Sequence, residues 1–145
     1  MNAPSDPQFA ARIRASFARQ QAMTLIGARL ATVAPGMVEI ELPFREDLTQ
    51  QKGFVHGGIV GMIADSAAGY AAYSLMPADC TLVTAEYKIN LLASATSSLV
   101  ARGEVVKAGR TLTVARAEVY ASDGTHVATM QQTLMMLSGR TDRPE

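Results

Sequence analysis

The fold is decided by residues 53–77, which read GFVHGGIVGMIADSAAGYAAYSLMP. From Gly57 to Leu75 nearly every residue is glycine, alanine or a larger apolar residue, and a helix that is apolar on all sides is a buried one. Met76-Pro77 ends the run, because the residue before a proline avoids helical backbone. The stretch therefore predicts one long helix at the centre of the molecule.

Segments with strand character stand on both sides of this helix. Before it, residues 30–34 and 38–42 alternate in polarity around a turn at Pro35-Gly36. After it, four segments follow at residues 81–92, 98–108, 112–121 and 125–137, with hairpin signals at Gly109-Arg110 and Asp123-Gly124. Two strands, a helix and four strands cannot form alternating parallel units. The predicted class is therefore α+β, with an antiparallel sheet wrapped around one long central helix.

The length of 145 residues fits a single domain spanning residues 1–145. Near the N-terminus, Phe9, Ile13 and Phe17 recur every four residues, which predicts an amphipathic surface helix over about residues 6–22. An organellar presequence is the alternative interpretation, because this segment is rich in arginine and poor in acids. The last residues, about 138–145, are expected to form a polar tail.

Composition excludes several classes of partner. Hydrophobic residues make up 48% of the chain and charged residues 18%, as a packed core requires. Thirteen basic and thirteen acidic residues cancel, so no basic field attracts nucleic acid or an anionic membrane. With Cys80 as the sole cysteine and two histidines, neither a disulfide nor a metal cluster is expected. We predict a cytoplasmic protein without metal, cofactor, nucleic-acid partner or membrane partner.

Asp65 is the first candidate for chemistry, because it lies in the middle of the most apolar helix. A carboxylate removed from water without a partner is strongly penalised, so it must be hydrogen-bonded, open to a cleft or protonated. One interpretation is a buried cap for the backbone N–H of a neighbouring segment. We favour the other interpretation, a general base or nucleophile at a cleft.

The start of the helix offers a second group of candidates. Gly57 and Gly58 stand where free backbone N–H groups and the positive end of the helix dipole favour an anionic oxygen, which predicts an oxyanion hole. A glycine pair that simply lets the chain turn sharply is the alternative. For His56 we prefer a structural role, in which the ring fastens this loop, over a catalytic imidazole. Gln50 and Thr84 supply an amide and a hydroxyl able to orient a carbonyl or a water molecule.

The spacing of Gly57 and Asp65 carries a prediction about assembly. Eight residues at a rise of about 1.5 Å each place their backbones about 12 Å apart along one helix. A carbonyl needs its donor and its attacking group within about 3–3.5 Å. If both groups serve one carbonyl, they come most simply from two chains whose helices run antiparallel across a twofold axis. We therefore predict an obligate dimer with two equal sites at its interface.

The segment Gly53-Phe54-Val55-His56-Gly57-Gly58, with Asp65 nine residues after the histidine, resembles the HGG…D pattern of one known family. These are the hotdog-fold acyl-CoA thioesterases of the PaaI, or phenylacetate-pathway, branch. The order of elements over residues 25–137 resembles the hotdog fold as well. The resemblance implies that the Gly57 N–H polarises the thioester carbonyl. It also implies that Asp65 of the partner subunit attacks this carbonyl or activates water.

The same resemblance implies roles for neighbouring residues. Gln50 matches an amide that helps to orient the substrate, Thr84 matches a hydroxyl that places water, and His56 and Gly58 belong to the substrate-binding loop. Some members carry Glu at the helix position and Thr one turn later, where this chain has Gly69. This departure leaves a nucleophilic and a water-mediated route both open. Members assemble as homodimers and commonly as homotetramers, which agrees with the spacing argument.

The expected function is hydrolysis of an acyl-CoA or aryl-acyl-CoA thioester to the free acid and CoA. The main alternative is a non-catalytic hotdog module that binds acyl-CoA, which the carboxylate of Asp65 disfavours. Another alternative is a hotdog hydratase acting on enoyl thioesters. That reaction requires a paired Asp and His in a different loop motif, and the sequence lacks the pair.

Overall fold

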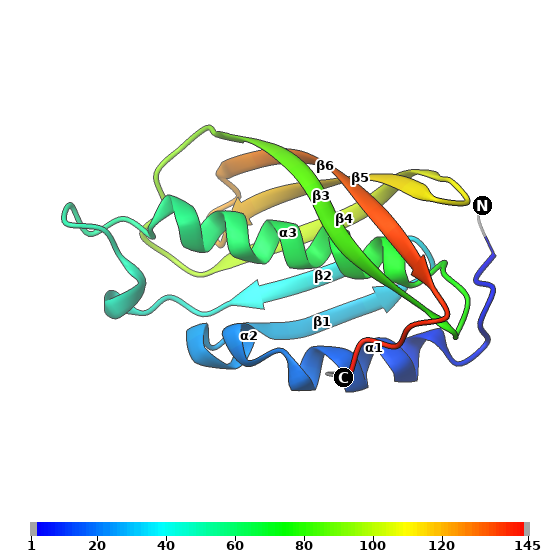
Figure 1. Ribbon diagram of the computed structural model, residues 1–145. Coiled ribbons are helices and arrows are strands. Elements are labelled where there is room, and N and C mark those ends of the chain that lie inside the picture. Colours follow the sequence, from blue (N-terminus) through cyan, green and yellow to red (C-terminus); the bar gives the residue numbers. More distant parts are fainter. Residues whose placement is uncertain (1–2, 144–145) are drawn as a thin grey trace.

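The computed structural model describes residues 3–143, in which a six-stranded sheet wraps around the long helix α3 (Figure 1). The elements in chain order are α1 (Phe9–Arg19), α2 (Gln21–Ile26), β1 (Arg29–Ala34), β2 (Met37–Leu42), the short 3-10 helix η1 (Glu46–Leu48), α3 (Gly57–Tyr73), β3 (Cys80–Leu91), β4 (Leu99–Ala108), β5 (Leu112–Ala121) and β6 (His126–Ser138). The sheet order is β1-β2-β4-β5-β6-β3, and every neighbouring pair is antiparallel. The predicted α+β class is confirmed. Within the described residues, no helix is both long and apolar enough to cross a membrane.

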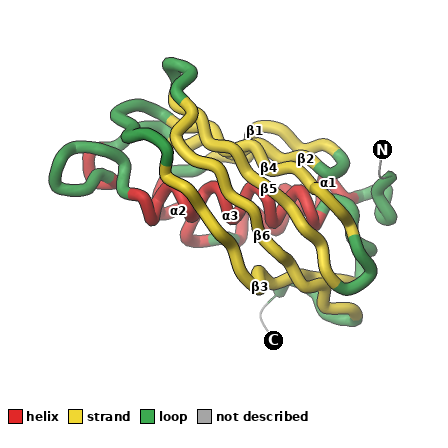
Figure 2. The backbone as a smooth tube through the Cα atoms, turned by 90° about the horizontal axis from the view of Figure 1, so that it is seen from above, coloured by secondary structure: helices red, strands yellow, loops and turns green. Residues whose placement is uncertain are grey.

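The predicted strands agree with the observed ones to within one residue at every end. Gly36 and Gly124 adopt φ values of 75° and 88°, so both turns use the left-handed backbone that glycine allows. The position of β3 was not apparent from the sequence. This strand lies at the edge of the sheet beside β6, and residues 92–98 carry the chain back to β4 in the interior (Figure 2). One side of β3 is therefore without a partner strand in the described part of the chain.

The N-terminal segment does not form the single helix that was expected over residues 6–22. It forms two helices, α1 and α2, separated by Gln20 with ψ of 91°. The Gln20 N–H donates to the carbonyl of Phe17 at 3.0 Å, and its side-chain oxygen accepts from the Ser66 hydroxyl at 3.4 Å. At this bend the Gln20 side chain contacts α3. The predicted apolar stripe is confirmed, since Ile13 is fully buried and Phe9 and Phe17 pack against the core.

Small residues fix how closely α3 approaches the sheet. Ala64, Ala67, Ala68 and Ala71 are all fully buried on the helix. On β4, a Cβ added at Gly103 would lie 2.2 Å from the Ala67 carbonyl oxygen, so the strand backbone touches the helix backbone directly. This contact sets the height of α3 above the sheet, and with it the position of every side chain that the helix presents.

Candidate active site

The start of α3 is capped by a histidine side chain. His56 is the N-cap residue, and its Nδ1 atom accepts a hydrogen bond from the Gly58 N–H at 2.8 Å. The His56 N–H in turn donates to the carbonyl of Leu48 at 2.9 Å, which ties the loop to the helix. An imidazole nitrogen that accepts a hydrogen bond carries a lone pair and no proton. The geometry supports the structural interpretation of His56.

Only one of the two expected glycine donors is free. The Gly58 N–H is engaged by His56, which corrects the expectation of a pair of open N–H groups. The Gly57 N–H meets no acceptor among residues 3–143, and the intrahelical bonds begin with the Ile59 and Val60 N–H groups donating to the His56 carbonyl. The Gly57 N–H therefore remains as a single donor at the positive end of the helix dipole.

Gln50 and Gly57 line the same pocket, which has a volume of about 280 Å³. A tight turn positions Gln50, because its N–H donates to the Phe54 carbonyl at 2.8 Å and its carbonyl accepts from the Gly53 N–H at 2.9 Å. Its side-chain oxygen accepts from the Lys52 N–H. The structure thus brings the Gln50 amide and the free N–H of Gly57 to one end of α3.

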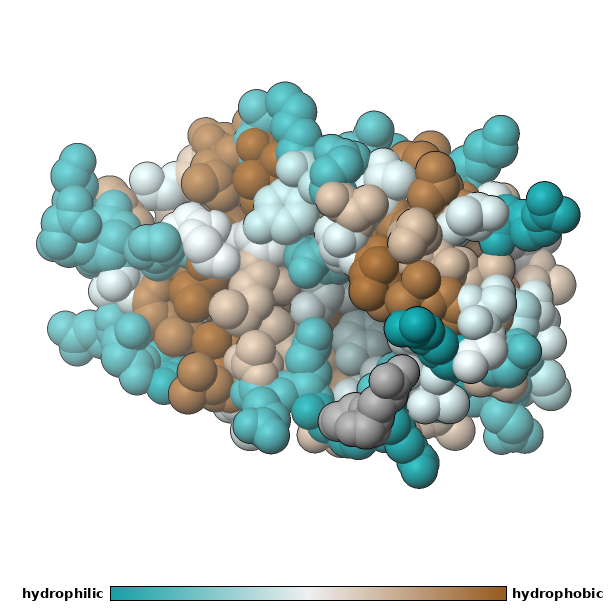
Figure 3. All heavy atoms as spheres, in the orientation of Figure 1, coloured by the Kyte–Doolittle hydropathy of each residue, from teal (hydrophilic) through white to brown (hydrophobic). Residues whose placement is uncertain are grey.

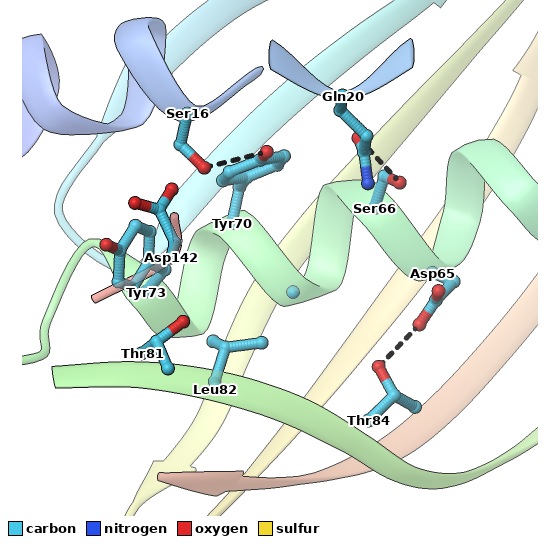
Figure 4. Close-up of a pocket in the computed structure, with 11 residues that line it drawn as sticks. Ser16, Gln20, Asp65, Ser66, Tyr70, Tyr73, Thr81, Leu82, Thr84 and Asp142 are labelled. Carbon is cyan, nitrogen blue, oxygen red and sulfur yellow. Dashed lines mark hydrogen bonds between the residues drawn. The ribbon is translucent and has the colours of Figure 1, made fainter. Parts of the chain in front are cut away.

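Asp65 lies two turns further along α3 and is half-buried. Its Oδ1 atom accepts a hydrogen bond from the Thr84 hydroxyl on β3 at 2.8 Å (Figure 4). The same oxygen accepts from the side-chain amide of Gln132 on β6 at 3.2 Å. Both donors are side chains, so Asp65 does not cap a backbone N–H in the described residues. The Asp65 side chain is thus held by two donors at the edge of a pocket, which is the placement that a general base or nucleophile requires.

Gln132 is a candidate site residue that the sequence analysis missed. It is fully buried on β6, between the buried Met130 and Leu134 of the same strand face. A polar residue at a buried position of an alternating strand is the signal that could have found it. Within residues 126–138 that signal is weak, because Gln131 and Thr133 beside it are polar too.

The pocket beside Asp65 has a volume of about 180 Å³ and extends from Thr84 toward α1. Many of its lining residues carry polar groups: Ser16, Gln20, Asp65, Ser66, Tyr70, Tyr73, Thr81, Thr84 and Asp142 (Figure 4). The hydroxyls of Ser16 and Tyr70 are 3.1 Å apart. Burial raises the pKa of the Tyr70 hydroxyl above its usual value, against the opposing effect of the Ser16 hydrogen bond. Tyr70 is therefore a neutral hydrogen-bonding group in this pocket.

Within one chain, the candidate residues lie in two separate pockets. Gln50 and Gly57 line the pocket at the start of α3, whereas Asp65 and Thr84 line the pocket halfway along the helix. At about 1.5 Å per residue, the eight residues from Gly57 to Asp65 separate the two halves by about 12 Å. In the described part of the chain, no three His, Cys, Asp or Glu side chains gather in a way suited to a metal ion.

Comparisons with known proteins agree with this architecture. The sequence model of the thioesterase superfamily matches residues 52–128, which is more than half of the chain. A thioesterase family protein from Silicibacter pomeroyi has a solved structure that shares 50% sequence identity, covers 90% of this chain and 99% of its own, and superposes with a TM-score of 0.87. The conserved protein PA5202 from Pseudomonas aeruginosa shares 31% identity over 83% of this chain and 99% of its own, with a TM-score of 0.77.

The PaaI protein from the phenylacetic acid degradation operon of E. coli is similar in fold. Its structure covers 92% of this chain and 96% of its own with a TM-score of 0.85, at 18% sequence identity. The match at 50% identity and the family match over the glycine pair and Asp65 agree with the expectation drawn from the HGG…D pattern. The chain therefore belongs to the thioesterase superfamily, has the hotdog fold and is a thioester hydrolase.

Proposed function

We propose that this enzyme hydrolyses an acyl-CoA or aryl-acyl-CoA thioester to the free acid and CoA, as a relative of the PaaI branch. The observation that carries the proposal is the carboxylate of Asp65, the sole charged side chain of α3, which Thr84 holds at the edge of a pocket. The Gly57 N–H polarises the thioester carbonyl, and Asp65 of the partner subunit supplies the base or nucleophile. Gln50 helps to orient the substrate carbonyl at the same end of the helix.

These groups can hydrolyse the thioester by two routes. In the first, Asp65 attacks the thioester carbon, the thiolate of CoA leaves, and water hydrolyses the resulting anhydride to the acid and the regenerated carboxylate. In the second, Asp65 takes a proton from water as the water oxygen bonds to the carbon, and returns the proton to the departing thiolate. In both, negative charge develops on the carbonyl oxygen and is stabilised by the Gly57 N–H. Single-turnover hydrolysis in ¹⁸O-labelled water identifies the first route when water opens the anhydride at its aspartyl carbonyl, because the label then enters Asp65, whereas the second route labels only the product acid.

The free edge of the sheet supports a shared site. β3 is 12 residues long and pairs only with β6 in the described part of the chain. Its side chains Val83, Tyr87 and Leu91 are 45%, 47% and 54% exposed, and Figure 3 shows apolar groups gathered in patches on the face seen in Figure 1. A long exposed apolar edge is a template for pairing with another chain.

The same edge lies directly over the start of α3. A Cβ added at Gly57 would meet Leu91 at 2.6 Å, and one added at Gly61 would lie 3.7 Å from the Tyr87 hydroxyl. A second copy that pairs along β3 brings its own α3 close to this one, in the antiparallel orientation that twofold symmetry imposes. We propose that a homodimer, or a homotetramer built from such dimers, contains two equal sites.

Thiol release from a panel of thioesters tests the proposed activity. Phenylacetyl-, benzoyl-, hexanoyl- and palmitoyl-CoA are compared under steady-state conditions, and the enzyme is expected to cleave at least one of them. The best substrate then defines the length and aromatic character that the acyl pocket accepts. Tight binding of acyl-CoA without cleavage would instead favour the binding module, and hydration of crotonyl-CoA would favour the hydratase.

Mixing two inactive variants tests whether the sites are shared. We expect a Gly57→Pro chain, which lacks the N–H, and an Asp65→Asn chain to recover about one quarter of wild-type activity after 1:1 unfolding and refolding together. Random pairing makes about half of the dimers mixed, and each mixed dimer contains one site with both native groups. Each variant refolded alone is the control. A mixture no more active than its components would show that each site is built from one chain.

A further inference from the structure

We infer that Gln132 is a positioning residue, which orients the carboxylate of Asp65 for the reaction; the inference rests on the catalytic role proposed for Asp65. Gln132 is fully buried in the middle of β6. Its amide nitrogen lies 3.2 Å from Oδ1 of Asp65 and 3.5 Å from the main-chain oxygen of the same residue. The buried amide is therefore directed at Asp65.

The side-chain oxygen of Gln132 makes no hydrogen bond with the described residues that would explain a polar residue in the core. This Oε1 atom is buried and meets no hydrogen-bond donor within residues 3–143. Reversing the amide would place Oε1 against the carboxylate oxygen, so that two acceptors would face each other. A buried acceptor without a donor destabilises the folded state, whereas an apolar side chain of similar shape would fill the site without this penalty. The hydrogen bond to Asp65 is thus the one interaction that glutamine makes with the described residues at this position and that an apolar side chain could not make.

The two donors to Asp65 converge on one oxygen from different strands. Thr84 on β3 and Gln132 on β6 both donate to Oδ1, and these strands are neighbours in the sheet. Two donors from separate backbones restrict rotation of the carboxylate about its terminal bond. Its Oδ2 atom accepts no hydrogen bond from the described residues. We therefore assign Oδ2 as the oxygen that attacks the thioester or removes the proton from water.

The variant Gln132→Met tests this role, because methionine keeps the length of the side chain and removes the donor. We expect kcat to fall about 10- to 100-fold with KM changed by less than about 2-fold, since misorientation affects the chemical step more than binding. We also expect the Tm to stay within about 3 °C of the wild type or to rise, because the unsatisfied buried oxygen is removed. Gln131→Met, at the exposed neighbouring position of β6, is the matched control and should keep wild-type kcat.

The background Asp65→Asn separates positioning from a structural effect. If Gln132 acts through Asp65, adding Gln132→Met to Asp65→Asn lowers the residual kcat no further. An equal loss in both backgrounds, or a Tm much below that of the wild type, would overturn the inference. So would wild-type kcat in Gln132→Met when Asp65→Asn is inactive. Wild-type activity in Asp65→Asn would instead reject the catalytic role proposed for Asp65, on which the inference rests. Gln132→Leu repeats the test with a second apolar side chain, and must show the same pattern.

Discussion

Asp65→Asn is expected to lower kcat for the best thioester by about 100-fold or more, within the range for loss of a general base. Asparagine keeps the shape of the side chain and still offers an oxygen to the Thr84 hydroxyl, which donates to Asp65 at 2.8 Å. It cannot ionise, so it neither attacks the thioester carbon nor takes a proton from water. Steady-state thiol release at matched protein concentration and oligomeric state measures the effect.

Asp47→Asn is the matched control for this substitution. Asp47 is an exposed carboxylate that pairs with Arg45 at 2.7 Å, in the short 3-10 helix η1 before α3. A neutral side chain at this position should leave kcat within about 2-fold of the wild type, because surface pairs contribute little. Equal activities of the wild type and Asp65→Asn would reject Asp65 as the catalytic carboxylate in either route.

Most of the fold could be predicted because its signals are local. The turns at Pro35-Gly36 and Asp123-Gly124 mark hairpins whose strands are close in sequence, and alternation of polarity shows which face is buried. The pairing of β3 with β6 has no such signal, because it joins segments separated by two other strands. The break at Gln20 was also hidden, since neither glycine nor proline stands there and the contact of its side chain with Ser66 on α3 joins residues far apart in the sequence.

In the candidate site, too, some residues could be predicted from the sequence and others could not. Asp65 could be identified because a charge in an apolar helix conflicts with its surroundings, and such conflicts indicate function. Gln132 escaped notice, because its bond to Asp65 spans 67 residues and becomes visible only when β6 lies beneath α3. The loss of Gly58 as a free donor depends on the orientation of the His56 ring. Residue types and spacings do not specify a side-chain orientation, so only the folded structure reveals this contact.

Gly57→Pro is expected to lower kcat by about 10²- to 10³-fold, the usual effect of removing one oxyanion donor. Gly57 is the first residue of α3, where proline fits the helix because an N–H at this position has no intrahelical acceptor. The preceding residue, His56, has φ of −60° and ψ of 135°, which is the extended backbone that residues before proline adopt. The substitution therefore removes the N–H and leaves the start of the helix in place.

Gly57→Ala is the control that separates the N–H from the added side chain. Both variants place a Cβ where Leu91 now lies 2.6 Å away, but Leu91 is 54% exposed and the clash is with the end of its flexible side chain. Alanine keeps the N–H, so Gly57→Ala should retain most of the wild-type kcat, and the ratio of the two variants measures the contribution of the donor. Thiol release from the best substrate, with circular dichroism to verify helix content, provides the comparison. The two variants differ toward the carbonyl oxygen only in this backbone N–H. Equal kcat values would therefore mean that another group stabilises the oxyanion.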